Sequence, residues 1–124
     1  MKQVLYLIGV SIFLIACSEN QDFDPERFRQ GDFEIPAGEN YGKTRIVRKD
    51  SLQIEFYENS FDTLVITWKN NFNYDLRMLN PKKPSDEDII HVQIKKIKAT
   101  SYTFEAKIGY TNFVQTGELF ILAD

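Results

Sequence analysis

A single cysteine and a single histidine are the side chains of this 124-residue chain that most readily act as a nucleophile, a base or a metal ligand. One Cys excludes an internal disulfide, and one Cys with one His excludes the usual zinc ligand sets. His91 lies beside apolar neighbours at the start of a predicted strand, where a lone His is more often a rim residue than a ligand. We therefore predict neither a metal site nor a cofactor.

The 18 Asp and Glu residues are the other candidates, because two converging carboxylates can perform general acid and base catalysis. Four of them lie in the middle of predicted strands, namely Glu34, Glu55, Asp75 and Glu105. Each alternates with apolar residues, which predicts that it faces solvent and does not meet a second carboxylate. No Ser or Thr lies in a nucleophile elbow, and no glycine-rich loop could hold a phosphate. The sequence therefore predicts a protein that is not an enzyme.

Cys17 follows the pattern of an export signal. Lys2 precedes a mostly apolar run over residues 4–16, and a polar segment begins at Ser18. These thirteen residues would form about 20 Å of helix, which is shorter than the bilayer core of about 30 Å. A basic start followed by about 7 to 15 apolar residues is typical of a secretory signal peptide. We predict that residues 1–16 are such a signal.

The residues Leu14-Ile15-Ala16-Cys17 resemble the lipobox of bacterial lipoproteins. The resemblance implies that the Cys17 thiol takes a diacylglyceryl group, and that cleavage after Ala16 leaves Cys17 as the first residue, carrying fatty acids such as palmitate. Two acyl chains give stable membrane attachment, whereas one chain is marginal. Residues 17–30 would then be the lipidated Cys and a tether. The expected location is the bacterial cell envelope, anchored to the outer membrane and facing either the periplasm or the outside.

From Gly31 onward the hydrophobic pattern has a period of two, which is typical of half-buried antiparallel strands. Turn residues separate these runs at intervals of about 8–12 residues, which leaves no space for crossover helices. The predicted strands cover about residues 31–36, 43–49, 51–58, 61–69, 72–79, 89–98, 101–109 and 114–122. We predict a single all-β domain over residues 31–124, an antiparallel up-and-down meander of about eight strands that forms a small barrel or a curved roll.

Two short helical turns are expected beside the strands. Asp24-Pro25 is typical of an N-cap followed by Pro at the first helical position, and this helix of one or two turns would end at Gly31. Phe28 would then fold over one end of the core. In the long connection over residues 80–88, Ser85 or Asp86 could cap a second turn.

Strand alternation also predicts what fills the interior. In the run over residues 52–57 it places Leu52, Ile54 and Phe56 inward and the polar residues between them outward. The large side chains predicted to face inward are Phe56, Trp68, Phe72, Tyr74, Tyr102 and Phe104. These six side chains favour a filled interior over an open pocket.

Two tripeptides, Asp50-Ser51-Leu52 and Asp62-Thr63-Leu64, resemble the Asp-Ser/Thr-apolar sequon that bacteroidete bacteria use for O-glycosylation. Ser51 and Thr63 are therefore candidate O-glycosylation sites. A simpler interpretation is also available, because Asp-Ser is a common turn start and Thr before Leu is normal strand alternation.

The chain as a whole resembles a set of short lipoproteins from bacteroidete bacteria. The matching motifs are Cys17 in its lipobox, Gly31-Asp32-Phe33, residues 48–55, Ile66-Thr67-Trp68, Asn73-Tyr74-Asp75-Leu76, residues 101–105 and Gly117-Glu118-Leu119. Members are often labelled DNA topoisomerase IV, but this chain is far too short for that enzyme and, at a pI of about 5.2, lacks a basic surface for nucleic acid. The resemblance implies lipidation and a small β domain, without an activity and without a nucleic acid partner.

Three functional hypotheses are compatible with these features. The first is a lipid-anchored, non-enzymatic binding or structural module, held at the membrane by acyl chains on Cys17 and partnered by an envelope protein or a glycan. The second is a small-ligand carrier, since Gly31-Asp32-Phe33 resembles the Gly-x-Trp opening strand of lipocalin-like barrels, with Phe in place of Trp. A carrier would need an internal cavity of about 300 Å³ or more. The third is an inhibitor of a host hydrolase that would insert the connection over residues 80–88 into a catalytic cleft.

Overall fold

The structure is a computed structural model that describes residues 23–109 and 111–122. The predicted signal peptide, Cys17 and residues 18–22 of the predicted tether lie outside the described residues. Within the described residues, no helix is long and apolar enough to cross a membrane.

Eight strands and two short 3-10 helices make up the described chain. The strands are β1 (Gly31–Ile35), β2 (Thr44–Lys49), β3 (Leu52–Tyr57), β4 (Ser60–Asn70), β5 (Asn73–Met78), β6 (Ile90–Ile97), β7 (Ser101–Ile108) and β8 (Val114–Ile121). The helices are η2 (Pro25–Phe28) and η3 (Pro84–Glu87). The prediction of an all-β meander of about eight strands is confirmed, because turn residues and alternation together locate each strand in this chain.

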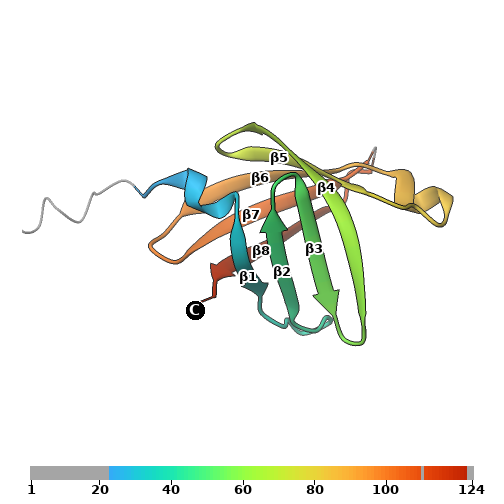
Figure 1. Ribbon diagram of the computed structural model, residues 1–124, viewed down its shortest axis with the longest axis horizontal. Coiled ribbons are helices and arrows are strands. Elements are labelled where there is room, and N and C mark those ends of the chain that lie inside the picture. Colours follow the sequence, from blue (N-terminus) through green and yellow to red (C-terminus); the bar gives the residue numbers. More distant parts are fainter. Residues whose placement is uncertain (1–22, 110, 123–124) are drawn as a thin grey trace, which may run out of the picture.

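The strands form a closed antiparallel barrel in which each strand pairs with the next along the chain (Figure 1). Closure is made by β1 and β8, where Phe33 pairs with Ile121 and Glu34 with Phe120. Of the two predicted forms, the barrel is therefore the one observed. Closure gives each of the eight strands in the described part of the chain a hydrogen-bonded neighbour on both sides, so this sheet has no free edge strand.

One end of the barrel, called the floor here, is covered by η2. The Asp24 side chain accepts a hydrogen bond from Glu26 N at 2.9 Å, and Pro25 occupies the first turn, as predicted. Phe28 is fully buried and packs edge-on against Tyr102, with ring centroids 4.9 Å apart. Arg29 and Arg27 fasten the helix further, through the Asn71 side chain and the Lys98 carbonyl. The prediction that Phe28 closes one end of the core is confirmed.

The other end of the barrel, called the mouth here, carries the β1–β2 loop and the long β5–β6 connection with η3. Figure 1 places η2 and η3 at opposite ends of the barrel. The predicted second helical turn is present, but its N-cap is Lys83, and no side chain caps it. The prediction of Ser85 or Asp86 as the cap is wrong, because Pro84 already fixes the first helical position and places both residues inside the turn.

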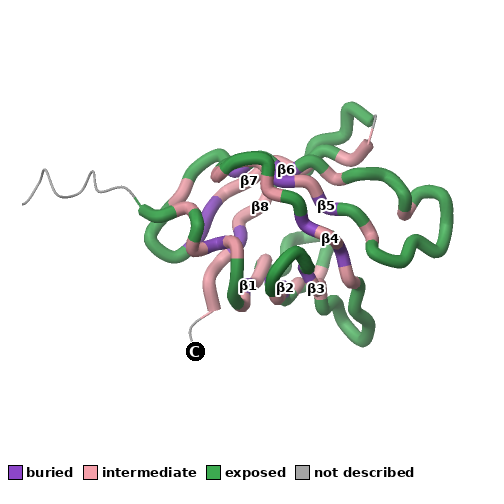
Figure 2. Tube along the Cα trace, turned by 45° about the horizontal axis from the view of Figure 1, so that its top comes forward, coloured by how far each residue is buried: buried purple, intermediate pink, exposed green. Residues whose placement is uncertain are grey.

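The core runs along the inward faces of the strands, and the loops are exposed (Figure 2). Its buried apolar side chains are Phe28, Phe33, Ile46, Leu64, Ile66, Tyr74, Leu76, Val92, Ile94, Tyr102 and Leu119. Trp68 and Phe104 are partly buried and pack against this core, as predicted. Phe72, at the β4–β5 turn, is 48% exposed, so its predicted inward position is wrong.

β3 has the opposite phase from the predicted one. Gln53 is 1% exposed, and Glu55 lies on the same inward face, whereas Leu52 and Phe56 are exposed on the outer face. The prediction that Glu55 faces solvent and Phe56 faces the core is wrong. The reason lies on β2, where Arg48 faces inward directly opposite Gln53 and requires hydrogen-bond acceptors. A strand whose register shifted by one residue would leave that guanidinium without Gln53.

Candidate functional site

A buried guanidinium forms the base of the candidate site. Arg48, on β2, is 2% exposed. Its Nε donates to Gln53 Oε1 at 2.8 Å, and its Nη1 donates to the Phe28 carbonyl oxygen at 2.9 Å. Its Nη2 donates to the hydroxyls of Tyr74 at 2.9 Å and Tyr102 at 3.0 Å. Arg48 thus joins η2 to strands β2, β3, β5 and β7 through four hydrogen bonds.

Aromatic side chains surround the same cation. The Arg48 guanidinium carbon lies 4.9 Å from the ring centroid of Tyr74, 5.3 Å from that of Phe33 and 5.6 Å from that of Trp68. Burial alone would lower the pKa of Arg48, but the phenol groups of Tyr102 and Tyr74 outweigh burial and hold that pKa above its ordinary value. Arg48 therefore stays charged inside an aromatic cage.

A short polar relay leads from Arg48 toward the mouth. Gln53 receives a hydrogen bond from Arg48 and donates one through Nε2 to Glu55 Oε2 at 2.7 Å. No other hydrogen-bond partner of the Glu55 carboxylate is found among residues 23–109 and 111–122. Burial raises the pKa of Glu55, against the hydrogen bond from Gln53, and the neighbouring Asp62 carboxylate raises it further.

The barrel interior above this relay contains a cavity of about 210 Å³. Arg48, Gln53 and Glu55 form its polar wall, together with Tyr74. The remaining lining is mainly apolar and comes from six of the eight strands; it includes Ile35, Ile46, Leu76, Ile90, Val92, Phe104, Ala106, Ile108 and Leu119. An apolar cavity with a few convergent polar groups is the usual form of a small-molecule site.

The prediction of a filled interior is correct only in part, because Trp68, Tyr74, Tyr102 and Phe104 lie in or against the core while a cavity remains, and β3 supplies the physical reason for that cavity. Phe56, which was expected to fill the space, lies outside the barrel, and the narrower side chains Gln53 and Glu55 occupy the inward positions. At about 210 Å³, the cavity is smaller than the roughly 300 Å³ that the carrier hypothesis requires. It is larger than the cavity of about 150 Å³ that suffices for benzene. A ligand of this cavity would therefore contain about one ring.

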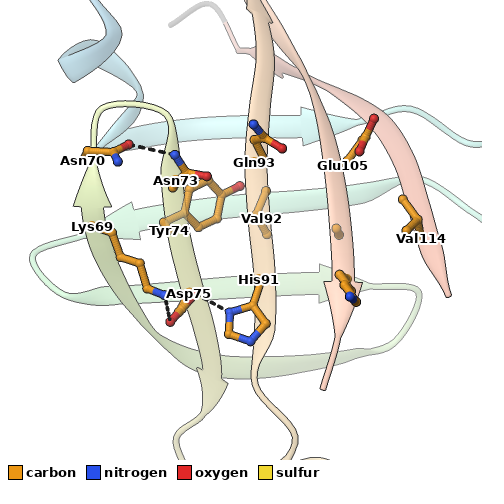
Figure 3. Close-up of a pocket in the computed structure, with 12 residues that line it drawn as sticks. Lys69, Asn70, Asn73, Tyr74, Asp75, His91, Val92, Gln93, Glu105 and Val114 are labelled. Carbon is orange, nitrogen blue, oxygen red and sulfur yellow. Dashed lines mark hydrogen bonds and ion pairs between the residues drawn. The ribbon is translucent and has the colours of Figure 1, made fainter. Parts of the chain in front are cut away.

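A second hollow, of about 350 Å³, lies on the outer surface over β4 to β8 (Figure 3). Asp75 has two partners there, His91 Nδ1 in a hydrogen bond at 2.7 Å and Lys69 Nζ in an ion pair at 3.2 Å. Burial opposes ionisation of Asp75, but the hydrogen bonds from His91 and Lys69 prevail and lower its pKa. His91 is exposed, as the prediction of a rim residue requires. The arrangement is an exposed ion-pair network, which contributes little to stability.

The outer face of β3 and β4 carries a strip of apolar side chains, called the outer strip here. It consists of Leu52, Ile54 and Phe56 on β3 with Phe61 and Val65 on β4. The rings of Phe56 and Phe61 lie 6.0 Å apart between centroids, and Phe61 is 64% exposed. The predicted division of β3 into an apolar and a polar face is therefore correct, but the apolar face is on the outside of the barrel.

The two candidate glycosylation residues lie near this strip in different settings. Ser51 is exposed in the β2–β3 turn, beside Asp50, whose φ of 58° is in the left-handed region. Thr63 is half-buried in the middle of β4, where it pairs with Ile54. Glycosylation of both residues stays a prediction, and the turn position makes Ser51 the more accessible of the two.

Sequence reasoning missed Arg48, Gln53 and Glu55 as a unit. One signal was present in the sequence. Arg48 lies two residues after Ile46 on β2, so a charged residue occupies the same face as a buried apolar one. Its neighbour Val47 is also apolar, however, so both faces of β2 carry an apolar residue and the sequence does not show which face is inward.

No family model matches the chain, and neither a curated protein nor a solved structure is significantly similar to it.

Proposed function

We propose that the protein is a lipid-anchored, non-enzymatic module of the bacterial cell envelope that binds a small molecule inside its barrel. The observation that carries the binding part is the interior cavity of about 210 Å³, with mainly apolar walls and the Glu55 carboxylate on one side. The anchoring part rests on the lipobox residues that end at Cys17. The cavity does not reach the roughly 300 Å³ set for the small-ligand carrier, so the proposal keeps that hypothesis only for ligands of about one ring.

The other two hypotheses stay predictions. A protein or glycan partner has the outer strip as a candidate surface, with Phe61 as its most exposed aromatic side chain. An inhibitor would use the β5–β6 connection, which is mostly exposed and contains η3.

The chain offers a direct test of binding in the cavity. Four isoleucines, Ile35, Ile46, Ile90 and Ile108, line the cavity, whereas Ile54 lies on the outer face. The full chain, carried in lipid nanodiscs with labelled isoleucine methyl groups, would be titrated with a panel of one-ring molecules that are neutral, cationic or anionic. At least one of them is expected to shift the methyl signals of the four cavity residues and to leave Ile54 unchanged.

A cavity-filling variant is the matched control. Ala106 lines the cavity on β7, and Ala106→Leu adds about three methyl-sized groups to that space. The variant should retain the dispersed methyl spectrum of the folded barrel and lose the shifts that the probe causes. Binding that persists in Ala106→Leu, or shifts confined to Ile54, would place the probe elsewhere and contradict the proposal.

A further inference from the structure

We propose that the ligand is a small organic cation, an amine on an apolar body of about one ring, whose ammonium group binds Glu55. This inference rests on the proposed function, because it names the ligand class of the same cavity. Glu55 faces the cavity and uses one oxygen, Oε2, to accept from Gln53. An ionised carboxylate has acceptor sites on both oxygens, so the Glu55 carboxylate can accept further donors from a ligand.

The charges on the inward face favour a cation toward the mouth. Glu55 pairs directly with Asp62 of β4, which places both carboxylates on the same side of the sheet. Asp62 is exposed nearer the rim, where the strand begins at Ser60. In the described strands, the positive charge on this inward face is that of Arg48, which lies two residue pairs from Glu55 in the direction of the floor. A ligand entering from the mouth therefore meets two carboxylates before it meets the guanidinium.

Arg48 is a poor receptor for an anionic ligand because protein groups already occupy its donors. Four of its five N–H groups donate to Gln53, the Phe28 carbonyl, Tyr74 and Tyr102. A ligand carboxylate would have to displace these partners in a buried site and would also approach Glu55. Breaking these buried hydrogen bonds would cost free energy that the ligand would have to supply.

The walls set the size and the character of the rest of the ligand. A volume of about 210 Å³ and the apolar side chains of Leu76, Ile90 and Phe104 suit one hydrocarbon ring. Phe104 also lines the cavity, and an aromatic face attracts a cation more than a neutral group of the same shape. An amine on one ring would place its ammonium group at Glu55 and its ring against the apolar walls.

Three probes of nearly the same shape separate charge from size: benzylamine, benzyl alcohol and benzoate. Each would be titrated into the full chain in nanodiscs at pH 7.5, followed by the methyl signals of Ile35, Ile46, Ile90 and Ile108. Benzylamine is expected to bind at least tenfold more tightly than benzyl alcohol, since hydrogen bonds to a charged group are about twice as strong as neutral ones. Benzoate is expected to cause no shift of the cavity signals.

The Glu55→Gln variant locates the effect at the carboxylate. It keeps an acceptor for Gln53 and is expected to weaken benzylamine binding at least tenfold, with the affinity for benzyl alcohol within twofold of the original. Glu34→Gln changes an outward carboxylate of β1, paired with Lys43 on the surface, and should leave both affinities unchanged. The comparison of the three probes on the original chain needs no variant, so it decides the matter even if Glu55→Gln does not fold.

The two ways of failing are distinguishable. Equal affinity for benzylamine and benzyl alcohol, tighter binding of benzoate, or no effect of Glu55→Gln would overturn the assignment of a cation while cavity binding stands. If neither these three probes nor the wider panel shifts the cavity signals, the proposed function fails together with this inference.

Discussion

At the scale of single residues, Arg48 illustrates how one buried charge organises its surroundings. Burying an unpaired guanidinium is very costly, and a fully hydrogen-bonded one is tolerated only when its partners have good geometry. Arg48 obtains its partners from η2 and from strands distant in sequence, at 2.8 to 3.0 Å. Most of these partners are neutral, so the formal negative charge nearest along the hydrogen-bonded relay is that of Glu55, which Arg48 reaches through Gln53.

Glu55 gives a prediction for the pH dependence of stability. Its pKa in the folded barrel lies above the ordinary value of 4.5, mainly because burial disfavours the carboxylate. As the pH rises from 4.5 through the folded pKa, the unfolded chain ionises this residue first, so the folded state loses stability over that range. Glu55→Gln cannot ionise. We expect the variant to gain stability relative to the original chain as the pH rises.

Urea denaturation of both chains between pH 4 and pH 8 measures this difference. The lowered pKa values of Asp75 and Glu118 cause the opposite trend, a loss of stability as the pH falls, but they are common to both chains and cancel in the comparison. The two free energies of unfolding should lie closest at the acidic end. A difference that is constant with pH would show that the folded pKa of Glu55 is not raised.

At the scale of elements, the approximate bounds of the strands were predictable. The face that each strand turns toward the core was not predictable in every case. Turn residues such as Lys49-Asp50-Ser51 and Glu58-Asn59-Ser60 locate hairpins through local backbone preferences, and both hairpins are present. Which face of β3 is inward depends on Arg48 of the neighbouring strand, which no period within β3 contains. The cavity could not be predicted for the same reason. It exists because Phe56 faces outward and does not fill the interior.

The helix η2 is expected to be an integral part of the barrel's stability. Phe28 is fully buried and contacts the rings of Tyr102 and Phe33, so Phe28→Ala would leave a hole at the floor. We expect a loss of about 3–5 kcal/mol in the free energy of unfolding, measured by urea denaturation. Phe23→Ala, at an exposed aromatic side chain two residues before η2, should change it by less than about 0.5 kcal/mol.

The backbone carbonyl of Phe28 still accepts from Arg48 in this variant, so the effect isolates packing from the hydrogen bond. A loss below about 1 kcal/mol would mean that the floor is closed without η2 and that Phe28 is only an accessory to the core.

At the scale of the whole molecule, the position of η2 determines which end of the barrel a lipid anchor would hold. The described chain starts at Phe23, next to the floor, and Phe23 is the sixth residue after Cys17. A fully extended chain of that length reaches at most about 20 Å. With acyl chains on Cys17, the floor would lie toward the membrane and the mouth would open away from it, toward water and any ligand dissolved there.

This orientation can be measured on the lipidated full chain in nanodiscs that contain a gadolinium-chelating lipid. The ion broadens nearby methyl signals, so Ile97 and Ile121, at the floor ends of β6 and β8, should broaden more than Ile35, Ile90 and Ile108 toward the mouth. Stronger broadening at the mouth would show that the barrel opens toward the bilayer.

Cys17→Ser should abolish incorporation of labelled palmitate and yield released or unprocessed protein, because the thiol is the acceptor that the lipobox resemblance implies. A Cys17→Ser chain that still takes up palmitate and remains at the membrane would contradict the anchor, and the predicted direction of the mouth would then have no basis.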